Sequence, residues 1–246
     1  MTAKRRIVIL GGAGDGSVIA EARLQVAAAG GGDELIGFLN DGLPRGELIY
    51  GKPVLGPLET WKEIDGDIAF AWALQRVGLM EERVERLRQL AIPEHRFATI
   101  VHPQSVVAST ARLGPGSFVA SFATLQPMTV VGPFASVRAG ANIGHHAEIG
   151  PHGYVGSNAT MCGHSRLEIG ACLSPNAVLL EHKTLGPYSF AGIGSAVTKD
   201  VPAGAVVMGN PARRVRVIRR PVVAEGDNSG AAMVAKRKEA ASGGGA

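Results

Sequence analysis

Hydrophobic positions along the second half of the chain recur with a period of six residues. Every sixth residue is aliphatic, and the set reads Val101, Val107, Leu113, Val119, Leu125, Val131, Val137, Ile143, Ile149, Val155, Met161, Leu167, Leu173, Leu179, Leu185, Ala191 and Val197. Neither the helical period of 3.6 nor the strand period of two explains this pattern. It is typical of a solenoid in which each short strand turns one aliphatic side chain inward before the chain bends.

A second set of small residues lies four positions after the aliphatic ones, with Lys183 as a polar exception. The set reads Ser105, Ala111, Ser117, Ala123, Thr129, Ala135, Ala141, Ala147, Gly153, Ala159, Ser165, Ala171, Ala177, Ser189 and Ser195. One large and one small residue per face fill a narrow three-sided core, and residues 18 apart then stack about 4.8 Å from one another. We predict a left-handed parallel β-helix of the hexapeptide-repeat type over residues 100–220.

Glycine directly follows several of the aliphatic residues, as at Gly114 and Gly144. We expect a corner of the coil there, because a side chain would strain the backbone. Aromatic residues make up only 5% of the chain, which agrees with a core too narrow for rings.

The first part of the chain, residues 1–99, alternates strand and helix patterns. Strands are expected at 6–10, 34–39 and 67–73, and helices at 18–29 and over the segment from Met80 to Ala91, which Pro93 ends. This alternation predicts a Rossmann-like parallel sheet with a glycine-rich turn after the first strand. The segment 221–246 has no hydrophobic periodicity and is predicted to be disordered.

Charge is distributed unevenly along the 246 residues, although the formal net charge is only +4. Eight of the 25 basic residues lie from Arg213 onward, so the rest of the chain has 17 basic and 18 acidic residues. No nucleic-acid recognition motif accompanies the basic segment, and we expect a solvated terminal strand or helix rather than a DNA-binding surface.

Without a signal-peptide pattern or a membrane-spanning apolar run, we expect a cytoplasmic location.

Two groups of polar or flexible residues in the first domain point to a nucleotide. The turn Gly11–Gly16 lies between a strand and a helix, where free backbone amides can face a phosphate. Asn40 and Asp41 end the second strand, where such folds present an acid to a ribose or a base. We expect this domain to bind a nucleotide or a nucleotide-sugar.

Histidines supply the candidate chemistry of the β-helix. His146, His164 and His182 are 18 apart and should stack in a column, and His145 lies next to the first of them. The column is either a set of outward polar residues at a tolerant position or one base with hydrogen-bonding neighbours. A metal site is not expected, because a straight ladder does not obviously converge on a tetrahedral ion.

Several motifs together resemble those of the NeuD/PglD-type sugar acyltransferases. They are the glycine turn, Phe38-Leu-Asn-Asp41, Ile100-Val-His-Pro103, the hexapeptide repeats, His145, and the ending Val197-Thr-Lys-Asp-Val-Pro202 to Gly209-Asn-Pro-Ala-Arg213. The resemblance covers residues 6–217. It implies an acetyl-CoA-dependent acetyltransferase that is a homotrimer and acts on a nucleotide-activated sugar in polysaccharide biosynthesis.

The resemblance also implies roles for individual residues. The general base is His145, with His146 beside it. The residues implied for the nucleotide-sugar are Gly11, Ala13, Gly14, Asp15, Asn40 and Asp41. Those implied for acetyl-CoA, between neighbouring β-helices, are Tyr154, Gly163, Pro175, Ile193, Asn210, Pro211, Ala212 and Arg213.

Three positions depart from the family pattern. His146 stands where the family has an acidic partner for the base, Asp15 stands where the glycine turn has histidine, and Tyr154 replaces a frequent histidine.

N-acetylation of an amino sugar is the preferred interpretation, and O-acetylation of a sugar or sialic acid is the first alternative. A γ-carbonic-anhydrase-like metal enzyme, using a pair such as His146 and His152, and a non-catalytic binding protein are the others.

Overall fold

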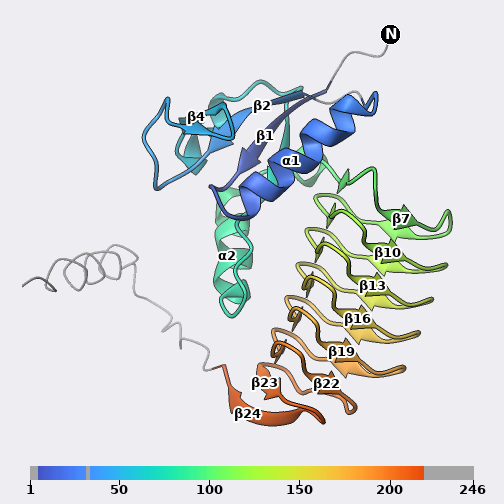
Figure 1. The fold of residues 1–246 in the computed structure, drawn as a ribbon. Helices are drawn as coiled ribbons and strands as arrows, with labels where there is room; N and C mark the ends of the chain where they lie inside the picture. The colour runs from blue at the N-terminus through green and yellow to red at the C-terminus, as the bar shows by residue number, and fades with distance from the viewer. Residues whose placement is uncertain (1–4, 32–33, 219–246) are drawn as a thin grey trace, which may run out of the picture.

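The computed structural model describes residues 5–31 and 34–218, which form an α/β unit followed by a stack of β-coils (Figure 1). The α/β unit sits at the N-terminal end of the stack and reaches down along one of its sides. The segment predicted to be disordered, 221–246, lies outside the described residues.

The N-terminal sheet has five strands in the order β3-β4-β2-β1-β5. Its bounds are Arg6–Leu10 for β1, Glu34–Leu39 for β2, Leu48–Ile49 for β3, Lys52–Gly56 for β4 and Ala69–Trp72 for β5. All pairings are parallel except that of β3 with β4. The predicted parallel arrangement of the first, second and last of these strands is confirmed. Strands β3 and β4 were not predicted, because Pro53 and Gly56 interrupt their hydrophobic pattern.

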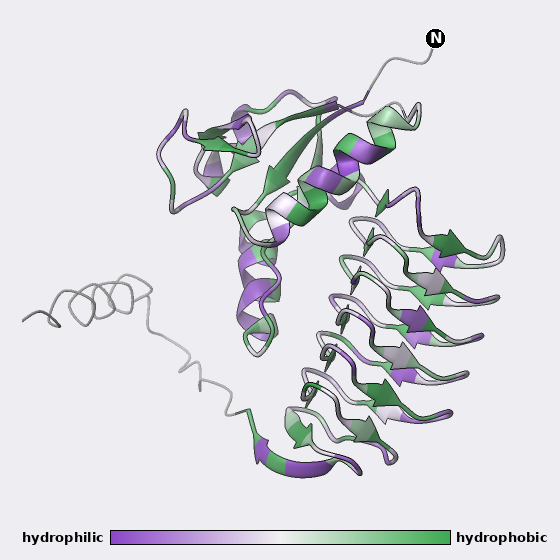
Figure 2. Ribbon diagram, in the orientation of Figure 1, coloured by the Kyte–Doolittle hydropathy of each residue, from purple (hydrophilic) through white to green (hydrophobic). Residues whose placement is uncertain are grey.

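Both faces of this sheet are covered, which explains why strand β1 is apolar on both of its sides after Arg6 (Figure 2). Ile7 and Ile9 pack with helix α1, Asp15–Ala28, and with the first coil of the β-helix. Val8 and Leu10 pack with α2, Met80–Leu90, and with the 3₁₀-helix η1, Leu58–Glu63. Helix α1 begins at Asp15, three residues before the expected start, because the glycine turn ends at Gly14.

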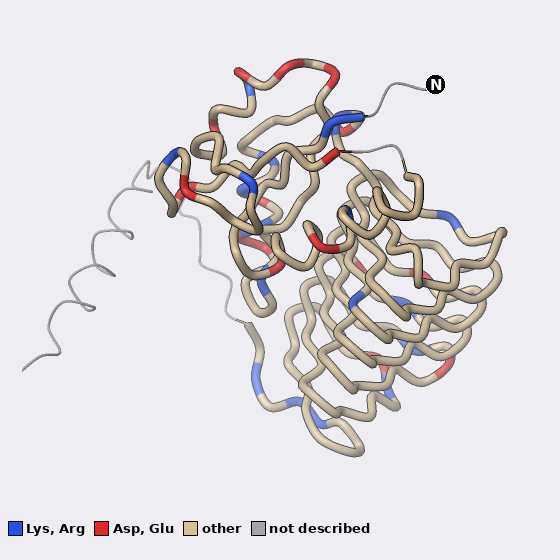
Figure 3. The backbone as a smooth tube through the Cα atoms, turned by 45° about the horizontal axis from the view of Figure 1, so that its top comes forward, with Lys and Arg blue, Asp and Glu red and all other residues tan. Residues whose placement is uncertain are grey.

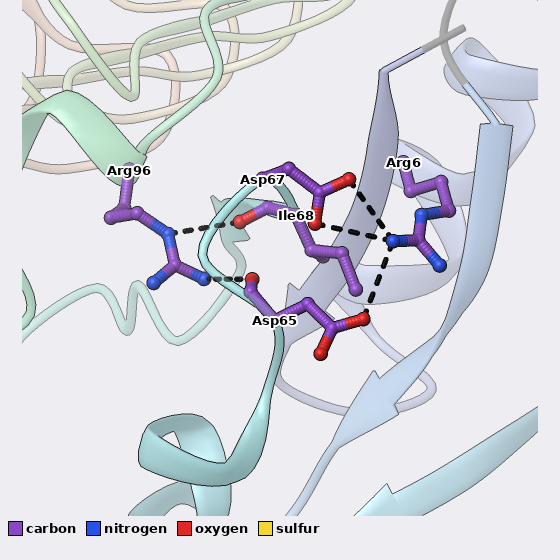
Figure 4. Close-up of polar contacts among 5 residues, drawn as sticks. All are labelled: Arg6, Asp65, Asp67, Ile68 and Arg96. Carbon is purple, nitrogen blue, oxygen red and sulfur yellow. Dashed lines mark hydrogen bonds and ion pairs between the residues drawn. The ribbon is translucent and has the colours of Figure 1, made fainter.

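Two arginines hold the loop that precedes β5 in place through hydrogen bonds and ion pairs (Figure 4). Arg6 on β1 donates to the Asp67 carboxylate at 3.0 and 3.2 Å and reaches Asp65 at 3.4 Å. Arg96, from the 3₁₀-helix η2 at Glu94–Arg96, donates to the backbone oxygens of Ile68 and Asp65. These contacts hold the loop before β5 against both neighbouring segments.

The β-helix has three sheets, each built mainly from two-residue strands. Sheet 1 contains β6 Ile100–Val101, β9 Phe118–Val119, β12 Ser136–Val137, β15 Tyr154–Val155, β18 Cys172–Leu173, β21 Phe190–Ala191, β23 Ala205–Met208 and β24 Arg213–Val217. Sheet 2 contains β7 Val106–Val107, β10 Thr124–Leu125, β13 Asn142–Ile143, β16 Thr160–Met161, β19 Val178–Leu179 and β22 Ala196–Val197. Sheet 3 contains β8 Arg112–Leu113, β11 Val130–Val131, β14 Glu148–Ile149, β17 Arg166–Leu167 and β20 Thr184–Leu185.

The predicted repeat is confirmed by the strand register. Leu125 pairs with Val107 on one side and with Ile143 on the other, and each partner is one coil of 18 residues away. The inward aliphatic residues of the central coils are fully buried, as are the small residues Ala141 and Ala159 beside them. The handedness of the coil stays a prediction from the repeat.

The corners are built differently from the expectation for glycine. The left-handed backbone occurs three residues after the aliphatic position, as at Gly116 and His146, and not at the glycine that directly follows it. Gly144 is needed for another reason: a Cβ there would lie 2.6 Å from the backbone nitrogen of Gly163 in the next coil. Close stacking of the coils, rather than backbone strain, therefore excludes side chains at these glycines.

The basic segment after Arg213 begins as the exposed strand β24, which pairs antiparallel with β23. Basic positions, in blue, lie along the chain just before the grey trace at the C-terminal end of the described residues (Figure 3). Arg213, Arg214 and Arg216 are all exposed on it. The expectation of a solvated terminal strand is therefore confirmed for the described part of this segment.

An aromatic stack joins the two units. Phe97, just before the β-helix, packs edge-on against Phe134 with ring centroids 4.8 Å apart, and the His152 ring stacks on the other side of Phe134 at 5.0 Å. Only 7% of His152 is exposed, and its Nδ1 has no hydrogen-bond partner among the described residues. Burial lowers the pKa of His152 to about 4, so the ring stays neutral near pH 7.

We expect Ile143→Ala to lower the free energy of unfolding by about 2 to 5 kcal/mol, because it opens a cavity between two coils. The matched control is Asn142→Ala, which changes the outward residue of the same strand and should have little effect. Denaturant unfolding followed by circular dichroism measures both. Equal losses for the two variants would contradict the assignment of the inward face.

The buried His152 should make the protein less stable in mild acid. Its pKa lies below the unfolded value of 6.5, so its contribution is complete above that pH and is lost as pH falls toward 4. We expect a loss of up to about 3 kcal/mol over this range. His152→Phe removes the titratable ring and should reduce the dependence of stability on pH. The fold should tolerate the phenylalanine, since Phe134 and Tyr188 occupy equivalent left-handed positions. The exposed His95→Asn serves as a control, and an unchanged slope in His152→Phe would contradict the prediction.

Candidate active site

The histidine corner is the set His145, His146, His164 and His182, where the chain passes from sheet 2 to sheet 3. His146, His164 and His182 each have a left-handed backbone with φ between 56° and 58°. Histidine tolerates this conformation better than most residues, so the column has a structural cause. The three rings stack at centroid distances of 4.8 and 4.9 Å, as the spacing of 18 predicts.

His145 turns toward this column instead of away from it. Its Nδ1 lies 3.2 Å from Nδ1 of His146, and its ring stands edge-on to that of His164 with centroids 5.1 Å apart. Side chains of adjacent strand residues point in opposite directions, but these two rings meet because the left-handed residue His146 redirects the chain. Gln126 fixes the backbone here by accepting a hydrogen bond from the His145 amide at 3.2 Å.

Gly163 provides the space that the His145 ring occupies. A Cβ on Gly163 would lie 2.8 Å from Cε1 and 2.9 Å from Nε2 of His145. The same point lies 3.3 Å from Oε1 of Glu181, which occupies the equivalent position one coil further on. Position 163 must therefore lack a side chain for His145 to lie beside the column.

The environment of the corner disfavours positive charge on its central ring. Loss of surrounding water lowers the pKa of His164, and repulsion from charge on His146, His182 and His145 lowers it further. Glu181 acts in the opposite direction and raises that pKa. A neutral imidazole donates at one ring nitrogen and has a lone pair at the other, which suits it to proton transfer and to metal binding.

The predicted glycine turn borders a small hollow. Gly12, Ala13, Gly14 and Asp15 line a cavity of about 250 Å³ together with Gln75, Arg76 and Arg83. Gly11 does not line the hollow; its φ of 146° lets it pack against the backbone of Ala73. Three of the predicted residues of the turn therefore line the hollow, and Gly11 serves for packing.

Asn40 and Asp41 are held by structural hydrogen bonds. Asn40 donates to the Gly11 oxygen at 3.0 Å and accepts from the Gly42 amide at 2.8 Å. Asp41 accepts from the Leu58 amide at 2.8 Å and pairs with Arg86 at 3.2 Å. Both residues border a larger hollow of about 1000 Å³ between α2 and sheet 1.

Asp15 is paired with a residue that the sequence did not suggest. Arg138, which follows β12, approaches the Asp15 carboxylate at 2.9 Å and lies over the rings of Phe118 and Tyr154. This ion pair joins the glycine turn to the β-helix and neutralises the carboxylate that replaces the family's histidine. Tyr154 is half-buried beneath the arginine, and burial raises its pKa.

Arginines of α2 line the two hollows, and sequence reasoning missed them. Arg83 and Arg86 lie three residues apart on the helix and line the larger hollow, and Arg83 lines both hollows. Their spacing of three residues indicates that they lie on one side of the helix. It does not indicate whether that side faces a hollow or the solvent.

The residues expected at acetyl-CoA lie in three places of one chain. Pro175, exposed Ile193 and the turn Gly209–Arg213 meet near the corner between sheets 1 and 2, where Gly194 donates to the Pro175 oxygen at 3.0 Å. Gly163 lies at the histidine corner, and Tyr154 faces the N-terminal unit. The structure therefore brings together only part of the expected set within one chain.

The pair considered for a carbonic-anhydrase-like metal site is not brought together. His146 is exposed at the histidine corner, whereas His152 is buried at the next corner against Phe134.

Within the described ranges, no helix is both long and apolar enough to cross a membrane.

Comparisons with known proteins identify relatives of the whole fold. The acetyltransferase domain of PglB from Neisseria gonorrhoeae, solved with acetyl coenzyme A, is 26% identical with a TM-score of 0.74 over 87% of this chain and 100% of that domain. A perosamine N-acetyltransferase from Caulobacter crescentus, solved with CoA and GDP-perosamine, is 23% identical with a TM-score of 0.73 over 85% of this chain and 95% of its own, which supports the fold.

Curated relatives match a shorter segment. A UDP-N-acetylglucosamine O-acyltransferase of Pseudomonas paraeruginosa, named for an acyl-carrier-protein donor, is 39% identical over 72 residues, which are 29% of this chain and 28% of the relative. The chain thus spans less than a third of that relative, and no family model matches it. The repeat, the fold and these similarities agree, and the chain is similar in fold to hexapeptide-repeat sugar acyltransferases.

Proposed function

We propose that the protein transfers an acetyl group from acetyl-CoA to the amine of a nucleotide-activated amino sugar. Residues 1–99 would form a Rossmann-like domain that binds the nucleotide-sugar, and residues 100–220 the acetyltransferase domain. The observation that carries the proposal is the His145–His146 contact at an exposed corner of a sugar-acyltransferase fold. The similarity to a protein solved with CoA and GDP-perosamine supports the choice of substrates.

His145 serves as the general base in this proposal. The contact between the two Nδ1 atoms fits a tautomer in which Nδ1–H of His145 donates to His146 and the lone pair of Nε2 is free to accept a proton. The sugar nitrogen attacks the thioester carbonyl, its proton passes to Nε2, and the carbon–sulfur bond breaks. The CoA thiolate then takes up the proton, so the histidine returns to its starting form without a covalent intermediate.

His146 takes the orienting role that an acidic residue has in related enzymes. A neutral imidazole accepts the hydrogen bond and fixes the tautomer of His145, but it does not supply a negative charge. Glu181 is the nearest carboxylate that borders Gly163, and it supplies part of that charge. We expect the base to be oriented well and activated less strongly than by a directly bonded carboxylate.

The hollow at the glycine turn is proposed as the phosphate site. The N-terminus of α1 and the side chains of Arg76 and Arg83 give it a positive potential, and Arg138 cancels the charge of Asp15. The larger hollow continues from it, sharing Leu74 and Arg83, and has room for the remaining parts of a nucleotide-sugar.

The proposed site is completed by a second copy of the chain. The larger hollow faces sheet 1, whereas the histidine corner joins sheets 2 and 3 and therefore lies across the core from it. A sugar held in one copy can reach His145 only in a neighbouring copy. This requirement, and the division of the expected acetyl-CoA residues between two corners, favour the homotrimer that the family resemblance implies.

O-acylation is the second candidate. The curated relative that matches 72 residues carries an O-acyltransferase name, and the same base can take a proton from a hydroxyl group. A panel of nucleotide-sugars with either an amine or a hydroxyl at the reacting carbon distinguishes the two reactions.

His145→Ala should reduce the rate of thiol release from acetyl-CoA by on the order of a hundredfold with an accepted nucleotide amino sugar, because the base is lost. His182→Asn, at the same corner and outside the proposed proton path, should retain the rate. A thiol-reactive dye follows the reaction in the presence of a chelator. An undiminished rate in His145→Ala would remove this residue from the mechanism.

Arg138→Ala should raise the KM for the nucleotide-sugar about tenfold, equivalent to ~1.4 kcal/mol, with a smaller effect on kcat. The substitution leaves the Asp15 carboxylate unpaired beside the phosphate site. Arg166→Ala is the control, because that exposed arginine pairs with Glu148 on sheet 3. Steady-state kinetics at saturating acetyl-CoA test the prediction, and the same KM in both variants would count against the phosphate site.

A further inference from the structure

The histidine corner has the geometry of a metal site, although no metal was expected there from the sequence. Nδ1 of His145 and Nδ1 of His146 lie 3.2 Å apart. Zinc–imidazole bonds of about 2.0 to 2.1 Å in a tetrahedron place two ligand nitrogens about 3.3 Å from one another. The two rings therefore already have the separation that a shared ion requires.

A third ring completes the set. One ring nitrogen from each of His145, His146 and His164 lies within 4.8 Å of the others, and all three residues are exposed to solvent. The ladder of His146, His164 and His182 alone would not converge. It does so here because Gly163 lets the His145 ring fold down beside His164.

We propose that His145, His146 and His164 bind a zinc-like divalent transition metal, and that this metal switches off the general base. Three imidazoles suit zinc, copper or nickel rather than magnesium or calcium, which prefer oxygen ligands. Three protein ligands leave the fourth tetrahedral position for water. The Glu181 carboxylate, on the far side of Gly163, offsets part of the charge of the ion.

The switch follows from the tautomer of His145, and this part of the inference rests on the proposed function. Catalysis needs the proton on Nδ1 and a lone pair on Nε2 of His145. A metal bound at Nδ1 requires a lone pair there, so the ring proton moves through solvent to Nε2. The ring remains neutral, but Nε2 is then a donor and no longer accepts the proton of the sugar amine.

Direct zinc titration tests the site without reference to catalysis. The full chain, purified without an affinity tag and cleared of metal with a chelator, is titrated with zinc chloride against a zinc-sensitive dye. We expect one zinc per chain, and His164→Asn should weaken binding at least tenfold, since even loss of a ligand-supporting group has an effect of that size. Asparagine tolerates the left-handed backbone of this position, so the fold should persist.

His182→Asn is the matched control for the titration. It has the same left-handed backbone and stacks on His164 at 4.9 Å, but lies outside the three-ligand set. It should bind zinc as the unchanged protein does. Less than stoichiometric zinc, equal affinity in His164→Asn and the unchanged protein, or equal weakening in both variants would overturn the site.

Activity assays separate this inference from the proposed function. For the unchanged protein and for His164→Asn, the rate of acetyl transfer with zinc is compared with the rate of the same protein with chelator. Added zinc should inhibit the unchanged protein at a concentration at least tenfold lower than it inhibits His164→Asn. Zinc binding without inhibition would overturn the switch alone. Absence of transfer with chelator would overturn the proposed function and leave the binding result intact.

Discussion

Stacking of the coils at the spacing of a β-sheet is the constraint on which the rest of the structure depends. Each two-residue strand is too short to be stable alone, and its backbone groups are satisfied only by the coils above and below it. The inward aliphatic residues then meet in an unbroken column, and the glycines at close approaches let the coils reach that spacing. One residue inserted into a coil would turn every later inward side chain to another face.

The same constraint organises the chemistry. A register of 18 residues places equivalent positions of successive coils directly above one another. One corner therefore has a column of histidines, and beside it a second column formed by His145, Gly163 and Glu181. The missing side chain at Gly163 converts a straight ladder into a cluster. In the proposals above, a metal at Nδ1 of His145 moves the ring proton to Nε2, the atom that accepts the proton of the sugar amine, and for that reason metal binding and proton transfer compete.

The sequence was informative where interactions are periodic or local. The repeat predicted the β-helix and its register, and the glycine turn between β1 and α1 could be recognised from its neighbours. Contacts between distant segments could not be predicted: the Asp15–Arg138 ion pair joins positions 123 residues apart, and the surface that Arg83 and Arg86 face depends on how α2 packs. The convergence of His145 on the column depended on the left-handed backbone at His146, which sequence alone does not fix.

Subunit complementation tests the central claim most directly, because the base and the nucleotide-sugar are proposed to lie in different copies of the chain. His145→Ala lacks the base, and a variant that combines Arg83→Ala with Arg138→Ala has a damaged nucleotide site. The two chains are co-expressed, and acetyl transfer is measured at a low nucleotide-sugar concentration. We expect the mixed assembly to be more active than the sum of the two separate variants. Activity no greater than that sum would contradict a site shared between copies.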